Sequence, residues 1–255
     1  MISDPSFSAL NKAFLQYINS LPVEHDEIRE HFEIKKDHTY RVIGNIRSIA
    51  VRSRLSEGET ELAKIIALFH DIGRFEQFIK YRTFNDDIAE NHAAISIRVL
   101  KEQHFLSAFD KKTGEIIAGS IENHNIPALP EIKDADVLLF SRLLRDADKL
   151  DIWRLTLDQN VAFTIMDSEE PASYQVPEVI LRCIREGRVV LLKYAHSMND
   201  FRLLRLSWLV DMNFPATFAI IKEKGYIDGI LAKMPEFPEK AEISGILHQV
   251  CHSRL

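Results

Sequence analysis

Four histidines and two aspartates in this chain have the side chains of a metal-binding site. They are His38, the adjacent pair His70-Asp71, His92, His124 and Asp148. Imidazole nitrogens combined with carboxylate oxygens suit Mn, Fe, Co, Ni or Zn, whereas Mg and Ca prefer shells built of oxygen atoms. Thiolate ligands are scarce, because the chain has only two cysteines, Cys183 and Cys251. The six residues therefore predict a site for one or two divalent transition-metal ions.

The pair His70-Asp71 carries most of this prediction because of the residues that precede it. Positions 62–69 read Leu-Ala-Lys-Ile-Ile-Ala-Leu-Phe, an apolar run that we expect to be buried. A carboxylate in such surroundings is costly unless it has a partner, and a metal ion is a suitable one. A second pair, His25-Asp26, lies between glutamates and is expected to be the solvated start of a helix.

Helices are expected to position these ligands. Apolar residues recur at spacings of three and four along the chain, and strand-like alternation is hard to find. We place His38 near the start of a helix, His70-Asp71 at the end of a helix over 62–69, His92 at the start of the next, His124 at the end of another, and Asp148 within a long helix over 137–157. The triplet Asn85-Asp86-Asp87 is expected to open a helix. Helix ends that converge would hold the ligands rigidly and leave an opening for a substrate.

Length, composition and charge limit the classes of function. The chain has 255 residues, of which 46% are hydrophobic, with a net charge of -6 and a pI near 5.9. Such an acidic chain is unsuited to a nucleic-acid duplex or an anionic membrane surface, while a local basic pocket for a phosphate is compatible with it. A membrane-spanning segment and a signal peptide are not expected. We therefore expect a cytoplasmic protein that acts on a small molecule.

Two helical parts are expected. Residues 1–165 would form the metal-binding core with an N-terminal helix, and residues 166–255 a C-terminal helical lobe packed on that core. The segment 166–177 is polar and contains two prolines, which favours a hinge between the parts. We expect the lobe to close the pocket or to form the surface of a homodimer.

Three motifs around the ligands resemble a known family. They read Asp37-His38-Thr39-Tyr40-Arg41-Val42, Leu68-Phe69-His70-Asp71-Ile72-Gly73-Arg74 and Arg145-Asp146-Ala147-Asp148-Lys149-Leu150-Asp151. In order and neighbourhood they resemble the HD-domain superfamily of metal-dependent phosphohydrolases, over roughly residues 25 to 160. The resemblance implies an all-α fold, an HD-domain helical bundle to which this chain adds a C-terminal helical extension.

The resemblance also implies roles for the ligands. His38, His70, Asp71 and Asp148 would bind one metal ion, and His92 and His124 resemble the variant that holds a second ion, with Asp71 bridging the two. We prefer Asp148 to Asp146 as the ligand because the ligating aspartate of the family is followed by a basic residue, as Lys149 follows it here. Asp146 and Asp148 point to different faces of one helix, so only one of them can serve.

The implied activity is hydrolysis of a phosphoester by a metal-activated water. The substrate would be a nucleotide or a small organic phosphate. Asp71, Lys149 and Arg74 are the expected catalytic residues, and Arg41, Arg74 and Lys149 are expected to bind the phosphoryl oxygens.

Two other functions use the same scaffold. A di-iron oxygenase, resembling myo-inositol oxygenase, could be built on the same ligand set and would activate dioxygen. A non-catalytic module that senses a nucleotide is the second alternative, although every ligand position is filled here. The phosphohydrolase is preferred because basic residues lie beside two of the ligand motifs.

Overall fold

The computed structural model of the chain describes residues 6–23, 25–158 and 174–255. Throughout these ranges the regular structure is helical and no strand occurs, which confirms the all-α prediction. The α-helices are α1 (Phe7–Ser20), α2 (Asp26–Arg52), α3 (Glu57–Phe69), α4 (Gly73–Tyr81), α5 (His92–Glu102), α6 (Lys111–Glu122), α7 (Ala135–Leu157), α8 (Glu178–Arg185), α9 (Met198–Ser207), α10 (Pro215–Glu223), α11 (Tyr226–Ala232) and α12 (Lys240–Ser253). Short 3-10 turns are η1 (Phe105–Ala108), η2 (Leu192–Tyr194) and η3 (Trp208–Asp211).

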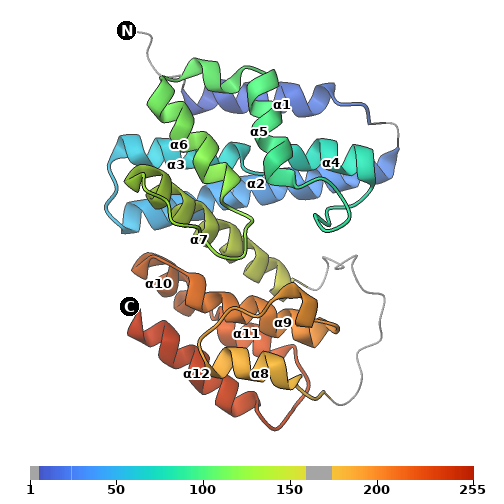
Figure 1. Cartoon of the computed structure of the whole chain (residues 1–255), viewed down its shortest axis with the longest axis vertical. Coiled ribbons are helices and arrows are strands. Elements are labelled where there is room, and N and C mark those ends of the chain that lie inside the picture. Colours follow the sequence, from blue (N-terminus) through green and yellow to red (C-terminus); the bar gives the residue numbers. More distant parts are fainter. Residues whose placement is uncertain (1–5, 24, 159–173) are drawn as a thin grey trace. The chain divides into compact units, whose positions relative to one another are not determined.

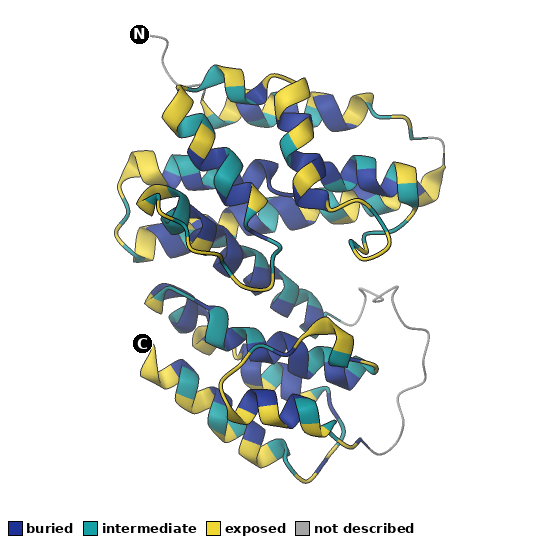
Figure 2. Ribbon diagram, in the orientation of Figure 1, coloured by how far each residue is buried: buried dark blue, intermediate teal, exposed yellow. Residues whose placement is uncertain are grey.

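The first compact unit, Met1–Asp148, is organised around the long helix α2. This helix packs against α3 and α4, while α1 packs on α3, α5 packs on α4, and α6 packs on both α3 and α5. Figure 1 shows α2 running across the unit with α3 and α4 beside it. In Figure 2 the buried residues gather on the helix faces that are turned toward one another. The amphipathic pattern of each helix explains this arrangement, because it leaves one apolar face to bury.

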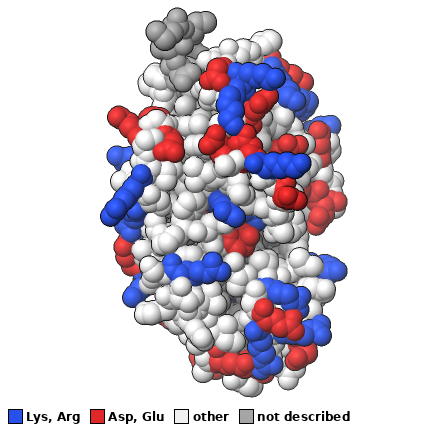
Figure 3. Space-filling model, turned by 60° about the vertical axis from the view of Figure 1, so that its left-hand side comes forward, with Lys and Arg blue, Asp and Glu red and all other residues white. Residues whose placement is uncertain are grey.

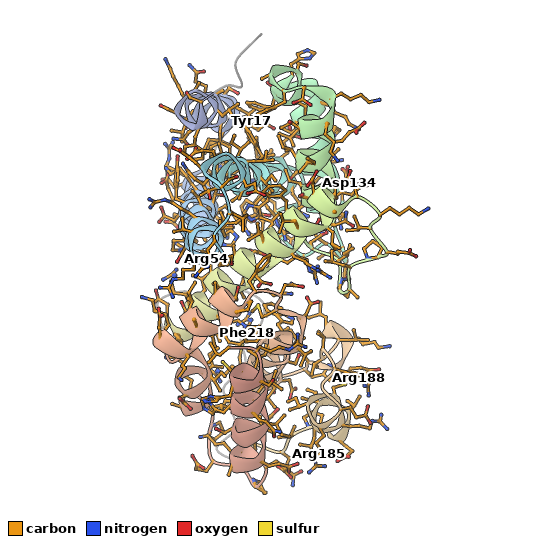
Figure 4. All side chains as sticks on the ribbon, turned by 90° about the vertical axis from the view of Figure 1, so that its left-hand side faces the viewer. Tyr17, Arg54, Asp134, Arg185, Arg188 and Phe218 are labelled. Carbon is orange, nitrogen blue, oxygen red and sulfur yellow. The ribbon has the colours of Figure 1, made fainter. Side chains whose placement is uncertain are left out.

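Aromatic side chains fill the interior of this unit. The ring of Phe14 in α1 meets Phe69 at 6.4 Å and Phe75 at 6.0 Å between ring centroids, both edge to face. Tyr17, labelled in Figure 4, donates a hydrogen bond from the same helix to Oε1 of Glu76 in α4 at 2.5 Å. These contacts fix the helices on either side of the turn that holds His70 and Asp71.

The second compact unit, Lys149–Leu255, contains the end of α7 and helices α8 to α12. Trp153 is fully buried in it and donates from Nε1 to the carbonyl of Arg205 at 2.9 Å. Phe218 of α10, labelled in Figure 4, is also buried. The predicted boundary between residues 165 and 166 lies outside the described residues, as does the predicted hinge up to residue 173.

Two local expectations are corrected by the structure. His38 lies in the middle of a helix, because α2 already begins at Asp26. The triplet Asn85-Asp86-Asp87 forms a turn, and the next helix begins at His92, where the side chain of Asn91 caps it by accepting from the backbone N–H of Ala93 and Ala94. The triplet fails to open a helix because the carboxylate of Asp86 is occupied by tertiary hydrogen bonds to other elements.

The surface carries both signs of charge. In Figure 3 lysine and arginine side chains alternate with aspartate and glutamate side chains over one face of the molecule. Among the described helices none is both long enough and apolar enough to cross a membrane.

Candidate metal centre

The six predicted ligands come together within the first unit. His38 lies inside α2, His70 ends α3, Asp71 follows it in the turn, His92 begins α5, His124 follows the end of α6, and Asp148 lies in α7. The four histidines and Asp71 are buried, whereas the side chain of Asp148 is 19% exposed. The ends of α3 and α6 and the start of α5 therefore converge on the interior of α2 and α7.

Asp71 stands between two groups of histidines and turns one carboxylate oxygen toward each. Its Oδ2 lies 3.6 Å from Nε2 of His38 and 3.8 Å from Nε2 of His70. Its Oδ1 lies 3.3 Å from Nε2 of His92 and 3.8 Å from Nε2 of His124. Each half forms a buried group whose ligand atoms lie within 4.8 Å of one another, and Asp71 belongs to both.

Asp148 joins the first of these two groups. Its Oδ1 lies 3.1 Å from Nε2 of His38, and that nitrogen lies 3.4 Å from Nε2 of His70. The structure thus places Asp148, the aspartate that we preferred, beside the first group. Asn45 helps to hold α7 there, because its Nδ2 donates to the carbonyl of Ala147 at 3.0 Å.

The ring orientation of three histidines is fixed by what their Nδ1 atoms contact. Nδ1 of His70 lies 2.8 Å from the carbonyl of Ala67, and Nδ1 of His124 lies 2.6 Å from the carbonyl of Ile121. Nδ1 of His92 lies 2.6 Å from Oδ2 of Asp86. A carbonyl and a carboxylate can only accept, so each Nδ1 carries the proton and each Nε2 presents a lone pair to the centre.

This arrangement of lone pairs fits a bound cation. Nε2 of His92 and Nε2 of His124 face each other at 2.9 Å, and both are acceptors when both Nδ1 atoms are protonated. Two acceptors at that distance repel unless a proton or a cation binds between them. With Oδ1 of Asp71 beside them, the nitrogen and oxygen donors match those preferred by Mn, Fe, Co, Ni or Zn.

Burial and neighbouring charges set protonation states that suit metal binding. Burial lowers the pKa of His70 to about 4, and burial together with Arg74 lowers the pKa of His92 to about 3. Burial raises the pKa of Asp71, but Lys35 and the other partners of its carboxyl outweigh this and hold the pKa well below its usual range. The two imidazoles are therefore neutral and Asp71 is ionised near pH 7.

A close approach between α4 and α5 brings Asp71 to His92. A Cβ atom on Gly73 would lie 2.5 Å from the backbone nitrogen of Ser96 and 2.6 Å from the carbonyl oxygen of His92. Ser96 joins the same turn, because its hydroxyl accepts from the N–H of Gly73 and donates to the carbonyl of His70, both at 2.9 Å. Only a residue without a side chain fits this position.

Arg74, predicted to bind substrate, is held by the loop between α4 and α5. Its Nη1 donates to Oε1 of Gln77 at 2.8 Å, to the carbonyl of Phe84 at 2.6 Å and to Oδ1 of Asp86 at 3.2 Å. Its Nε lies 3.6 Å from Oδ1 of Asp71. These contacts give Arg74 a positioning role between Asp71 and the loop, and its contact with a substrate stays a prediction.

Lys149 and Arg41 were the other predicted substrate-binding residues. Lys149 directly follows Asp148, but its ammonium pairs with the carboxylate of Asp211 within the second unit. Arg41 lies one turn beyond His38 on α2 and is half-buried. Both assignments stay predictions, and for Lys149 a substrate would compete with Asp211.

Three residues beside the ligands were missed by sequence reasoning. Asp86 fixes His92, as described above. Lys35 places Nζ 3.0 Å from Oδ2 of Asp71. Arg145 donates from its guanidinium to the carbonyls of His124 at 3.2 Å, Ile126 at 2.5 Å and Pro127 at 3.3 Å. For Lys35 the spacing was a usable signal, since it precedes His38 by one helical turn just as Arg41 follows it.

A comparison with known protein families gives a match that spans the centre. Residues 36–153 match the family model of the HD domain, and this segment includes all six predicted ligands. The chain therefore contains an HD domain. The resemblance seen in the three sequence motifs is confirmed over these residues. Neither the curated proteins nor the solved structures include one that matches the chain.

Proposed function

We propose that this HD-domain protein is a metal-dependent phosphohydrolase that cleaves a phosphoester of a nucleotide or another small organic phosphate. The observation that carries the proposal is Asp71, which directs one oxygen to the pair His38 and His70 and the other to the pair His92 and His124. A carboxylate shared in this way is suited to bridge two cations, as in two-metal hydrolases.

The residues supply the ligands and the electrostatics that hydrolysis needs. Divalent ions held by the two groups would activate a water molecule and offset negative charge on the phosphoryl oxygens. In the reaction the water oxygen bonds to phosphorus while the phosphorus–oxygen bond to the leaving alcohol breaks. One water proton ends on that alcohol and the other stays with the phosphate. The chain provides no separate nucleophile in this scheme.

Burial of the centre favours this chemistry. Each histidine side chain is 6% exposed or less, so the interactions of an ionic substrate with the centre would be little screened by water. His70, His92 and His124 already direct their Nε2 lone pairs at the centre, so these side chains need little rearrangement to bind ions.

The test joins metal analysis to a panel of phosphoesters. Protein purified without chelator should contain one or two transition-metal ions per chain and should hydrolyse at least one phosphate ester with Mn, Co or Ni. Asp71→Ala should lose this turnover. The proposal is wrong if fully metallated protein hydrolyses no phosphomonoester or phosphodiester.

A di-iron oxygenase is the second candidate, because the shared carboxylate between two histidine pairs also suits two iron ions. The same preparation separates the two candidates. Iron-loaded protein with a di-iron signal that responds to oxygen, in the absence of any phosphoesterase activity, would favour the oxygenase. Loss of a ligand position would have indicated a non-catalytic nucleotide sensor, and all six positions are filled.

A further inference from the structure

Lys35 reaches the centre from its more open side. It lies on α2 one turn before His38, and its Nζ is 3.0 Å from Oδ2 of Asp71. The side chain of Lys35 is 18% exposed, close to the value for Asp148 and well above those of the four histidines. The ammonium therefore lies beside the buried ligands on a side chain that solvent still reaches.

An aromatic ring confines this ammonium. The ring of Phe84, in the loop between α4 and α5, lies with its centroid 5.0 Å from Nζ of Lys35. Phe84 is held in turn by Phe78 at 4.8 Å and by His31 at 5.8 Å between ring centroids. A cation over an aromatic face is attracted to it, so Phe84 keeps the ammonium directed toward Asp71.

The oxygen that Lys35 contacts is one that a metal ion would use. Oδ2 of Asp71 also faces His38 and His70, the pair that forms the first group of ligands. A divalent cation held by this group would offset the negative charge of the carboxylate and would repel the ammonium beside it. Lys35 would then be free to pair with an anion that binds at the centre.

Arg74 differs from Lys35 in the partners that balance its charge. Its Nη1 is already shared among Gln77, the carbonyl of Phe84 and Asp86, so its charge is balanced by the loop. Lys35, in contrast, forms its ion pair within the described residues with Asp71 itself. Of the two cations beside Asp71, Lys35 is the one that gains a partner when an anion binds.

We infer that Lys35 binds the phosphoryl group of the substrate, and that the substrate is a phosphate monoester in its dianionic form. The inference rests on the proposed function. Two divalent ions would exceed the charge of Asp71 and Asp148, Lys35 would add one more positive charge, and Arg74 is offset by Asp86. Such an excess favours a monoester dianion over a diester, which carries a single negative charge.

The neighbouring lysine on α2 provides a matched control. Lys36 pairs with Glu33 one turn back on the same helix, so Lys36→Met removes the same charge from the next position without touching the centre. The full chain is loaded with Mn, and binding of inorganic phosphate is measured by calorimetry for the wild type, Lys35→Met and Lys36→Met, with the metal content of each.

The expected result is that Lys35→Met weakens phosphate binding at least tenfold, while Lys36→Met binds as the wild type does and all three hold equal amounts of metal. Equal phosphate affinity in Lys35→Met and Lys36→Met would overturn the inference. Loss of metal from Lys35→Met alone would also overturn it, because Lys35 would then act by supporting Asp71. A wild type that binds no phosphate and hydrolyses no ester would overturn the proposed function, and this inference with it.

A pair of chromogenic esters tests the substrate class. The monoester 4-nitrophenyl phosphate and the diester bis(4-nitrophenyl) phosphate share a leaving group and differ in charge. Lys35→Met should reduce kcat/KM for the monoester at least tenfold more than for the diester. An equal reduction for both esters, or a wild type that prefers the diester, would contradict the assignment of a monoester.

Discussion

Asp86 accepts a hydrogen bond from Nδ1 of His92 at 2.6 Å, and this contact joins a surface loop to the candidate metal centre. The same carboxylate accepts from Nη1 of Arg74 at 3.2 Å and from Nε2 of Gln77 at 2.8 Å. A histidine that donates its far nitrogen to a carboxylate is fixed in both tautomer and ring orientation. Asp86 therefore determines which nitrogen of His92 faces the second group of ligands.

Replacing Asp86 by asparagine should weaken the binding of metal at His92 and His124. The amide of Asp86→Asn can donate to Nδ1 of His92, which moves the proton to Nε2 and removes its lone pair from the centre. We expect about a 10- to 100-fold loss of affinity at that group, with binding at His38 and His70 retained. Metal titration of the variant measures both values.

Asp87→Asn is the control for this experiment, because Asp87 lies in the same turn and is exposed. It should bind metal as the wild type does. Unchanged affinity at both groups in Asp86→Asn would show that His92 is not oriented in this way.

Gly73→Ala should destabilise the protein and disturb the centre together. The added Cβ would meet the backbone of Ser96 and His92 at 2.5 and 2.6 Å, so α4 and α5 must move apart. Overpacking of this kind costs about 1–3 kcal/mol. Urea denaturation followed by circular dichroism measures the loss of unfolding free energy.

Gly44→Ala is the matched control in this case. Gly44 lies on the exposed face of α2, and a Cβ there would have no atom within 4 Å. Alanine in an exposed helix interior is favoured over glycine by roughly 0.5–1 kcal/mol, so this variant should be more stable than the wild type. Equal effects of the two substitutions would argue against the close approach at Gly73.

Arg145→Met should loosen the segment that carries His124. The guanidinium binds the carbonyls of His124, Ile126 and Pro127, and methionine leaves these oxygens without that donor. Unsatisfied buried polar groups cost about 1–3 kcal/mol each. We expect a lower unfolding free energy and weaker metal binding at the second group, whereas Arg142→Met, at an exposed position one turn earlier, should change neither.

Stability of the metal-free protein should fall as the pH drops from about 6.5 to 4. The folded pKa of His70, about 4, and that of His92, about 3, lie below the value of an unfolded histidine. The unfolded state therefore binds more protons in this window, and unfolding becomes easier as the pH falls. Depressed carboxyl pKa values, as in Asp71, add a further loss only near and below pH 4.

Unfolding free energies at pH 7, 6, 5 and 4 test this. The double variant with His70→Asn and His92→Asn should have a shallower slope between pH 6.5 and 4. A wild-type stability that stays constant over that interval would contradict neutral, buried imidazoles at these positions.

The fold class could be read from the sequence because it rests on local patterns, whereas the six candidate ligands came partly from such a pattern and partly from the resemblance of three motifs to a family. Spacings of three and four predicted the helices, and the apolar run before His70 predicted its burial. His38 was misplaced on its helix because residues 26–37 are mostly charged or polar, which hides the start of α2. Where most residues of an amphipathic helix belong to its exposed face, the recurring pattern of apolar residues is weak.

Apart from Lys35, the residues around the ligands could not be predicted, since their roles depend on tertiary contacts. Asp86 resembles a helix-opening residue in sequence, yet its partners are Arg74, Gln77 and His92 on two different helices. Arg145 contacts backbone carbonyls some twenty positions earlier in the chain. Every residue has a backbone carbonyl, so the sequence does not indicate which of them a side chain will contact. The ion pair of Lys149 with Asp211 also depends on a tertiary contact, so the sequence did not predict it.

Crystals grown with Mn and measured by anomalous scattering test the central claim most directly. The account predicts two anomalous peaks in the first unit, one beside each oxygen of Asp71, the first also near His38 and His70 and the second near His92 and His124. A single peak remote from His92 and His124, or peaks that Asp71 does not join, would contradict it.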